Sequence, residues 1–300
     1  MTAPGCPTCC RSITGPGICG NCGYDVPRQW LEETTLSIAL TGARSAGKSI
    51  LIAVMMEQFR YFLEQRHHTF LEPLGDTEGW FLDTYVKPLY GEGSMLKPTP
   101  KEPVIPLMWS FRYGNQRVCL ALYDAAGEHF ETLAPNDEGF AYLGNVDLLV
   151  SMIDPLKIEG IRAILDGQVT VPTGAGNDLS VLRLLLRARA AHAQRDKRQA
   201  LAIVLSKFDV IQDLRHMNAA PWQSVMNRPG SAMMRDPSFV SLGEDAAETT
   251  RLEEELRSLL HAMKSHLLLS AANEAHIPHR LFAVSALGRP PSSGAVHRVG

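Results

Sequence analysis

The sequence predicts an α/β protein with a mostly parallel sheet, preceded by a small cysteine-rich module. Two patterns predict this fold class. From residue 34 onward, short β-branched or aliphatic runs alternate with longer runs of helical periodicity, which is typical of strands and helices laid on a parallel sheet. In addition, five of the six cysteines lie within the first 22 residues, a clustering that is not typical of core cysteines.

The composition is that of an ordinary globular protein. Of the 300 residues, 45% are hydrophobic and 20% are charged, and 29 basic against 32 acidic residues leave a net charge of −3. This balance argues against a general nucleic-acid binder. No apolar run is long enough for a membrane span, and the N-terminus lacks the features of a secretion signal, so we expect a cytoplasmic protein.

The periodicity places the expected strands and helices. Only residues 114–116 separate the second expected strand from the third, which predicts a hairpin and one antiparallel edge strand. Leucines at helical spacing between Leu252 and Leu267 predict the core face of the last helix. The expected strands are 36–41, 107–113, 117–123, 146–153, 201–205 and 281–284, and the expected helices are 49–65, 178–195 and 245–271.

The clustered cysteines predict a zinc site. Cys6 and Cys9 form one Cys-x-x-Cys pair, and Cys19 and Cys22 form another. In a reducing compartment, two such pairs offer four thiolates to one tetrahedral Zn²⁺. We expect Cys10 to supply no ligand, and Cys119 to be a core residue. The module is interpreted as a metal-held structural knob, with a partner-binding or redox role as the alternative.

The domain organisation follows from these patterns. We expect a zinc ribbon over residues 1–28, a linker over 29–33 whose Trp30 docks the ribbon onto the main domain, a main domain over 34–290 and a tail over 291–300. Two inserts, near 67–98 and 211–244, are long for plain connections and predict either a partner surface or extra helices packed on the core. Their large apolar side chains are Trp80, Phe81, Tyr85, Tyr90, Trp222, Met226, Met233, Met234 and Phe239.

A phosphate-binding loop follows the first expected strand. Residues 42–49 read Gly-Ala-Arg-Ser-Ala-Gly-Lys-Ser and match G-x-x-x-x-G-K-[ST] at the start of a helix. In this motif the backbone N–H groups and the helix N-terminus face the phosphates, the lysine reaches the β- and γ-phosphates, and the last hydroxyl binds Mg²⁺. The predicted nucleotide-binding positions here are Gly42, Ser45, Ala46, Gly47, Lys48, Ser49 and Ile50.

Two further segments predict a metal site and a γ-phosphate contact. Asp124 ends the third expected strand and is placed to hold Mg²⁺, while Gly127 offers an N–H to a γ-phosphate. Thr99 precedes the hairpin and is placed to add a second hydroxyl to the metal. The predicted Mg²⁺ ligands are therefore Ser49, Thr99 and Asp124.

The last two expected strands end in a predicted base pocket. Asp209 is placed to accept both N1–H and the exocyclic amine of guanine, a charged bidentate contact that adenine does not satisfy. The stem of Lys207 is expected to cover the base. The other predicted members of this pocket are Ser206, Ser285, Ala286 and Leu287.

The ordered set Gly42–Ser49, Thr99, Asp124–Gly127, Ser206–Asp209 and Ser285–Leu287 resembles the five motifs of the Ras-like GTPases over about residues 34–290. The loop sequence, the long insert before Thr99, the Asp-Ala-Ala-Gly-Glu segment and the zinc knuckle are similar to the bacterial double-GTPase proteins. The resemblance implies a P-loop NTPase fold of the Ras-like G-domain type and a nucleotide-controlled role in bacterial conflict or defence. After Pro290 no apolar helix follows, so a piece of the family architecture is expected to be missing.

The sequence departs from the Ras-like pattern at the catalytic positions. Glu128 stands where glutamine commonly orients the attacking water, and His129 follows it, so slow or differently organised hydrolysis is expected. Arg44 is placed to reach the γ-phosphate, to block an incoming activator, or simply to lie in solvent. Together with Lys48, these residues are the catalytic candidates.

Three functional hypotheses stay open at this point. The first is a Mg²⁺-dependent GTPase switch, the second is a hydrolysis-poor GTP-binding scaffold that recruits a partner through its ribbon, and the third is an ATP-driven enzyme. The expected partners are GTP or GDP and a protein partner or activator, self-association included. Neither nucleic acid nor a membrane span is expected.

Overall fold

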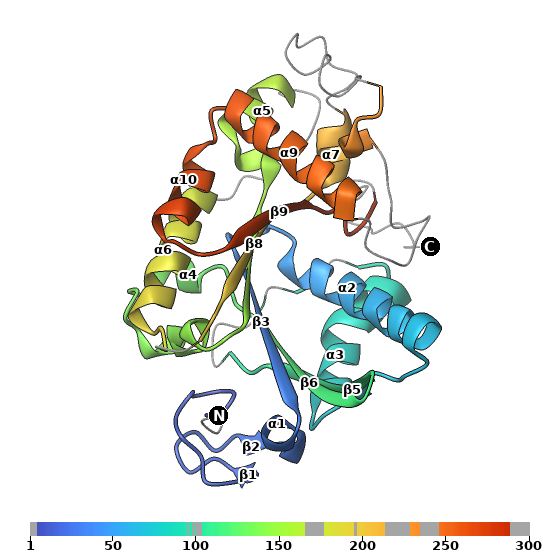
Figure 1. The fold of residues 1–300 in the computed structure, drawn as a ribbon, viewed down its shortest axis with the longest axis vertical. Helices are drawn as coiled ribbons and strands as arrows, with labels where there is room; N and C mark the ends of the chain where they lie inside the picture. Colours follow the sequence, from blue (N-terminus) through green and yellow to red (C-terminus); the bar gives the residue numbers. More distant parts are fainter. Residues whose placement is uncertain are drawn as a thin grey trace.

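The structure of the chain is a computed structural model. It describes residues 5–94, 96–97, 99, 104–165, 177–194, 197–213, 229–234 and 246–288. Its core is a seven-stranded sheet between two helical layers, with a two-stranded N-terminal module at one end (Figure 1). The strands are β1 (Gly17–Ile18), β2 (Asp25–Val26), β3 (Thr34–Gly42), β4 (Glu72–Pro73), β5 (Leu107–Tyr113), β6 (Gln116–Asp124), β7 (Leu148–Ile153), β8 (Ala200–Leu205) and β9 (His279–Ala283).

The α-helices are α1 (Arg28–Glu32), α2 (Lys48–Phe62), α3 (Thr77–Phe81), α4 (His129–Thr132), α5 (Glu159–Leu165), α6 (Asp178–Ala191), α7 (Phe208–Asp213), α9 (Ala246–Ala262) and α10 (Leu267–Glu274). Two π-helical segments, η1 (Leu63–His67) and η2 (Leu82–Gly91), continue α2 and α3 without a break. The 3₁₀ turns are η3 (Glu138–Gly144), η4 (Pro155–Lys157) and η6 (Ala232–Met234).

The sheet has the predicted mostly parallel topology. Its order is β4-β5-β6-β3-β7-β8-β9, and the pairs from β6 to β9 are parallel. The hairpin strand β5 is antiparallel to β6, as the short turn at 114–115 predicts. The outermost strand is nevertheless β4, which has only two residues and pairs with the outer side of β5. A strand of two residues leaves no periodic pattern in the sequence, so β4 was not predicted.

Strict alternation along the strands builds two cores, one on each face of the sheet. On β6, Cys119, Ala121 and Tyr123 face one side, while Leu120 and Leu122 face the other. The first side is covered by α6, α9, α10 and the N-terminal ribbon, and the second by α2, α3 and η2 (Figure 1). Buried Cys119 is the core residue that the sequence predicts.

The ribbon docks on the sheet through specific polar contacts. The indole Nε1 of Trp30 donates to the Gly5 carbonyl at 2.8 Å, which ties α1 to the ribbon. From the sheet side, the Tyr123 hydroxyl donates to the Pro7 carbonyl at 2.6 Å in a buried contact. The predicted linker 29–33 is therefore ordered, and α1 occupies most of it.

The prediction of one continuous helix over residues 245–271 is wrong. The chain forms α9 and α10 instead, because Lys264 takes a left-handed φ of 56° and the Ser265 N–H donates to the Leu260 carbonyl at 2.8 Å. The predicted apolar stripe is still buried on α9, where Leu256, Leu259 and Leu260 are inaccessible. A helical period continues through such a turn, so the stripe alone does not show the break.

The first insert packs largely on the core. Phe81, Tyr85 and Leu89 on α3 and η2 are buried, and Phe81 stacks edge-on against Trp109 of β5 with ring centroids 5.6 Å apart. Trp80 is half exposed and faces outward. Most of the second insert, including Trp222, Met226 and Phe239, lies outside the described residues, whereas Met233 is buried against α9 and its neighbours.

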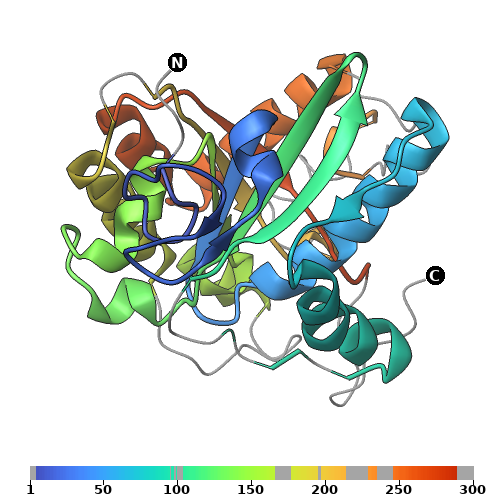
Figure 2. The ribbon, with the colours of Figure 1, turned by 90° about the horizontal axis from the view of Figure 1, so that it is seen from below.

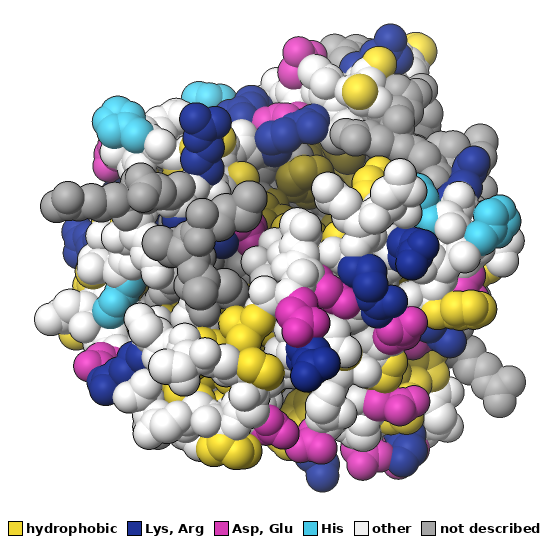
Figure 3. All heavy atoms as spheres, turned by 60° about the horizontal axis from the view of Figure 1, so that its bottom comes forward, with side chains coloured by type: hydrophobic (Ala, Val, Ile, Leu, Met, Phe, Trp, Pro, Cys, Tyr) yellow, Lys and Arg dark blue, Asp and Glu magenta, His cyan; other side chains and the backbone are white. Residues whose placement is uncertain are grey.

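Charged groups of both signs are interspersed on the face that carries the ribbon, without one large patch of either sign (Figure 3). On α6, Arg183 and Arg187 are exposed. Among the described residues, no helix is both long and apolar enough to cross a membrane.

Candidate functional site

The loop between β3 and α2 has the geometry that its glycines predict. Gly42 has a φ of 147°, and a Cβ there would lie 2.7 Å from the Met152 carbonyl oxygen of β7. Gly47 has a φ of 88° at the cap position of α2, where only glycine is unstrained. Ser45, at a φ of 62°, completes the curl between them. The loop therefore turns its backbone inward above the start of α2.

The Lys48 ammonium is held inside this loop. Its Nζ donates to the Gly42 carbonyl at 3.0 Å and to the Ala43 carbonyl at 3.2 Å. The side chain is buried, and burial lowers the pKa of Lys48 while the nearby Asp124 carboxylate opposes that effect. A phosphate in the loop would supply the countercharge that two neutral carbonyls do not.

Three hydroxyl and carboxylate groups converge beside Lys48. The Ser49 hydroxyl donates to Oδ2 of Asp124 at 2.9 Å, and the Thr99 hydroxyl donates to the same oxygen at 3.1 Å. The hydroxyls of Ser49 and Thr99 lie 3.1 Å from each other. The structure thus brings together the three predicted Mg²⁺ ligands, which come from α2, β6 and the segment before β5.

The chemistry of this cluster fits Mg²⁺. Oδ1 of Asp124 is buried and has no hydrogen-bond partner among the described residues. Burial raises the pKa of the Asp124 carboxyl, and the Lys48 ammonium opposes the rise. An unpaired carboxylate oxygen next to two hydroxyls is the oxygen donor set that Mg²⁺ accepts alongside phosphate oxygens and water.

Tyr85 also joins this cluster, although it lies in no sequence motif. Its hydroxyl donates to Oδ2 of Asp124 at 3.0 Å, and its ring stacks on Phe81 with centroids 5.5 Å apart. Burial raises the pKa of Tyr85, so the hydroxyl stays protonated and acts as a donor. In the sequence, Tyr85 is one aromatic residue of an insert, and no pattern signals its contact with a strand 39 residues later.

The loop after Asp124 lies against the phosphate loop. A Cβ on Gly127 would lie 2.7 Å from the Arg44 backbone nitrogen, so only glycine fits this close approach. Across the same contact, Nε of Arg44 pairs with Oε1 of Glu128 at 3.5 Å. His129 is buried at the start of α4, and neither ring nitrogen has a partner among the described residues. Of the catalytic candidates, Arg44 and Glu128 thus face each other, whereas His129 points into the protein.

The predicted base-pocket residues gather after β8 and β9. Oδ1 of Asp209 accepts a hydrogen bond from the Ser285 hydroxyl at 2.6 Å, and Ser285 in turn accepts from the Gly288 N–H at 3.1 Å. The Ser206 hydroxyl is buried and donates to the Ile153 carbonyl. Ala286 and Leu287 lie in the turn between Ser285 and Gly288. These bonds tie the two loops together around Asp209.

Two buried acidic residues connect the base pocket with the phosphate loop. Lys207, at a left-handed φ of 50°, donates from Nζ to Oδ2 of fully buried Asp154 at 2.6 Å. The Asp154 N–H donates to Asp178 at 2.8 Å, and burial raises the pKa of Asp178 to about 6. Lys157 completes the connection by donating to the Arg44 carbonyl at 2.8 Å. Sequence reasoning missed this network, because Asp154, Lys157 and Asp178 lie outside the phosphate- and base-binding motifs.

The strand register shows that all these loops leave the same edge of the sheet. Leu40 pairs with Asp124, Gly42 with Met152, Ile153 with Leu205, and Leu205 with Ala283. Because β3, β6, β7, β8 and β9 are parallel, Lys48, Asp124 and Asp209 all lie at or just beyond the carboxyl ends of their strands, which are β3, β6 and β8. Ligands of open α/β sheets bind at this edge.

The four predicted zinc ligands lie together in the N-terminal ribbon. The Sγ atoms of Cys6, Cys9, Cys19 and Cys22 all lie within 4.8 Å of one another. The Cys6–Cys22 and Cys9–Cys19 sulfur distances are 3.6 and 3.8 Å. Tetrahedral Zn–S bonds of about 2.3 Å require sulfurs about 3.8 Å apart, so the thiols fit Zn²⁺.

The two cysteine turns share one backbone pattern. The N–H groups of Cys6 and Cys19 donate to the carbonyls five residues later, and those of Cys10 and Gly23 donate back to Cys6 and Cys19. Cys10, at a φ of 58°, therefore occupies the left-handed position that Gly23 occupies in the second turn. This explains why Cys10 stands outside the four-thiol cluster.

Comparison with known proteins assigns the family. The family model described as Double-GTPase 2 matches residues 36–264. The chain belongs to the Double-GTPase 2 family. The match confirms the resemblance drawn from the motifs, and the Double-GTPase 2 model covers the phosphate loop, Asp124 and Asp209 but not the zinc ribbon.

The Double-GTPase 2 chain also resembles a curated protein of Mycolicibacterium smegmatis, provisionally named ESX-1 scaffolding and assembly protein SaeC. The two are 33% identical over 307 residues, which span 97% of this chain and 77% of the relative. The similarity therefore includes the ribbon as well as the Double-GTPase 2 region.

The zinc content of cysteine variants tests the assigned ligands, with Cys10 as the control. Freshly reduced protein should contain one Zn²⁺ per chain, and Cys22→Ser should lower the zinc affinity at least about tenfold, because one of four thiolates is lost. Cys10→Ser should retain the metal. Metal analysis of both variants checks this, and equal zinc loss in the two would contradict the assigned ligand set.

The substitution Tyr85→Phe tests the contact between Tyr85 and Asp124. Removal of the Tyr85 hydroxyl takes an orienting hydrogen bond away from Asp124. The Mg²⁺ concentration needed to retain bound nucleotide should therefore rise about tenfold. Release of a fluorescent guanine nucleotide across a Mg²⁺ titration measures this. Tyr61→Phe, which removes an exposed hydroxyl from α2, should leave the titration unchanged, and a response equal to that of Tyr85→Phe would refute the role of Tyr85.

Proposed function

We propose that this chain is a Mg²⁺-dependent GTP-binding protein that hydrolyses GTP and acts as a molecular switch. The observation that carries the proposal is the convergence at one sheet edge of the Lys48 ammonium, the Asp124 cluster and the Asp209 carboxylate. Lys48 would hold the β- and γ-phosphates, while Ser49, Thr99 and Asp124 would hold Mg²⁺, which neutralises phosphate charge.

Guanine preference follows from the charge of Asp209. A carboxylate accepts the two adjacent N–H groups of guanine, whereas adenine presents an acceptor at N1 and would leave the carboxylate unsatisfied. Ser285 holds Oδ1 of Asp209, and the loop that carries Lys207 is fixed through Asp154. The carboxylate is therefore already oriented before a base arrives.

The proposed switch depends on two segments of the chain that a γ-phosphate would contact. Thr99 and the Asp124–Glu128 segment are separate pieces of chain that meet at the metal cluster. GTP would hold both through Mg²⁺ and the Gly127 N–H, and hydrolysis would remove that link. Glu128, in place of the usual glutamine, is held by Arg44, and its charge disfavours the approach of a γ-phosphate.

A second candidate function is a GTP-binding scaffold with little hydrolysis. The Arg44–Glu128 ion pair favours it, because it engages both residues that would otherwise assist the reaction. The name of the M. smegmatis relative refers to scaffolding and assembly, which also fits a chain that binds protein partners. A role in bacterial conflict stays a prediction from the sequence resemblance.

Nucleotide selectivity tests the binding proposal. Labelled GDP should bind at least about a hundredfold more tightly than labelled ADP in the presence of Mg²⁺, and Asp209→Ala should remove most of that preference. Glu274→Ala, at the exposed end of α10, should retain it. Lys48→Ala should abolish binding of both nucleotides. Equal affinities for GDP and ADP in the native chain would exclude the guanine assignment.

Phosphate release separates the two candidate functions. Native protein should release phosphate from GTP above the level of Lys48→Ala, and Glu128→Gln should raise the rate about tenfold by removing a negative charge beside the γ-phosphate. If native protein releases no more phosphate than Lys48→Ala while still binding GTP, the scaffold is favoured and the switch is ruled out.

A further inference from the structure

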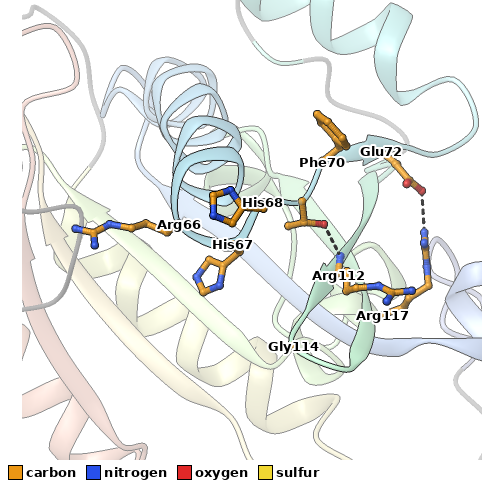
Figure 4. Close-up of a pocket in the computed structure, with 9 residues that line it drawn as sticks. Arg66, His67, His68, Phe70, Glu72, Arg112, Gly114 and Arg117 are labelled. Carbon is orange, nitrogen blue, oxygen red and sulfur yellow. Dashed lines mark hydrogen bonds and ion pairs between the residues drawn. The ribbon is translucent and has the colours of Figure 1, made fainter.

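A pocket lies at the end of the sheet opposite the proposed nucleotide site. It has a volume of about 430 Å³ and is formed by the loop after η1 and by the β5–β6 hairpin (Figure 4). The hairpin turn at 114–115 marks the amino end of β6, whereas Asp124 marks its carboxyl end. The pocket and the proposed nucleotide site therefore do not share residues. Its lining consists of Arg66, His67, His68, Thr69, Phe70, Glu72, Arg112, Gly114 and Arg117.

The loop that lines the pocket is strained and firmly anchored. The helix α2 continues into the π-helical η1, and His68 then takes a left-handed φ of 50°. The Thr69 hydroxyl accepts a hydrogen bond from the Arg112 backbone N–H of β5 at 3.3 Å. The His67 ring lies between Phe62 and Tyr113, with centroids 5.1 and 5.0 Å away. π-Helical turns and left-handed non-glycine residues are often retained at binding sites, since they carry a cost in stability.

The pocket carries an excess of positive charge. Three arginines against one glutamate leave its lining at a formal +2 with both histidines neutral. Arg117 is engaged with Glu33 and Glu72, each at 2.7 Å. Within the described residues, Arg66 and Arg112 have no carboxylate partner. Figure 4 shows Arg66 on one side of the two histidines, with its guanidinium directed away from them, and Arg112 with Arg117 on the other side.

Exposed aromatic rings lie around these cations. Phe70 lines the pocket and is 71% exposed, and Tyr113, whose ring contacts that of His67, is 59% exposed. The hairpin and the end of α2 stand together at one corner of the molecule (Figure 2). Arginine and exposed aromatic residues are the types enriched at the centres of protein interfaces.

The wall of the pocket favours a peptide over a phosphate. The helix formed by α2 and η1 ends here, so its last carbonyls bring partial negative charge and accept N–H groups. Glu72 adds a carboxylate to the rim. A compact dianion would meet this negative charge, whereas an extended peptide can place carboxylates at Arg66 and Arg112 and offer backbone N–H groups between them. The interspersed charges in Figure 3 likewise do not form the continuous basic surface that nucleic acid needs.

We propose that this pocket binds an acidic segment of a partner protein, with carboxylates on Arg66 and Arg112 and an apolar side chain on Phe70. The site lies away from Lys48, so it presents a docking surface that is separate from the bound nucleotide. The pocket and the zinc ribbon are therefore two different surfaces through which the chain could recruit a partner.

Fluorescence polarisation with a labelled Glu-Glu-Leu-Glu-Glu peptide tests the proposal on the full chain. The native protein should bind this peptide more tightly than the matched Gln-Gln-Leu-Gln-Gln peptide. The double variant Arg66→Ala/Arg112→Ala should lose about tenfold in affinity. The control Arg183→Ala/Arg187→Ala, which removes two exposed arginines from α6 and the same net charge, should bind as the native protein does.

The measurement has outcomes that overturn the proposal. These are equal binding of the Glu and Gln peptides, equal loss in the two double variants, or tighter binding of a single-stranded RNA than of the acidic peptide. Displacement of the peptide by inorganic phosphate at equal concentration would likewise overturn the peptide assignment. Because guanine-nucleotide binding depends on other residues, it should be unchanged in Arg66→Ala/Arg112→Ala and serves as the folding control.

Discussion

The parallel pairing of β3 with β6 is the constraint on which the candidate site depends. It sets Leu40 opposite Asp124, and the Ala125 N–H continues the pairing by donating to the Leu40 carbonyl at 3.3 Å. This register brings the Asp124 carboxylate to Ser49 at the start of α2 and seats Gly127 against the Arg44 backbone. A shift of one residue would turn Asp124 toward the other face of the sheet and separate the two loops.

The same strand also connects the site to the zinc ribbon. Tyr123 and Asp124 are neighbours on β6, and alternation points Tyr123 toward the ribbon while Asp124 reaches the hydroxyls of Ser49 and Thr99. Tyr123 holds the Pro7 carbonyl beside Cys6, and its ring stacks on Tyr142 with centroids 5.1 Å apart. The ribbon thus closes one face of the sheet behind the site, which fits a structural role for its four-cysteine cluster.

Local signals predicted most of the fold and much of the site. Alternating runs located the parallel strands, and the motif between β3 and α2 located Lys48 and Ser49, because these features lie in short stretches of sequence. Contacts between distant segments could not be predicted in the same way. Tyr85 reaches Asp124 from an insert with no motif, and Asp154, Lys157 and Lys207 form their network only after β7 and β8 pair. The break between α9 and α10 was missed because Lys264 interrupts the backbone but not the apolar period.

The most direct measurement of the central claim is a crystal structure of the full chain with GDP and Mg²⁺. The account predicts a single nucleotide along the carboxyl edge of the sheet, with its β-phosphate at the Lys48 ammonium and guanine N1 and N2 on the Asp209 carboxylate. Mg²⁺ should lie at Ser49, with Asp124 beside it. A nucleotide bound elsewhere, or one whose phosphates meet Lys48 while its base lies away from Asp209, would contradict the account.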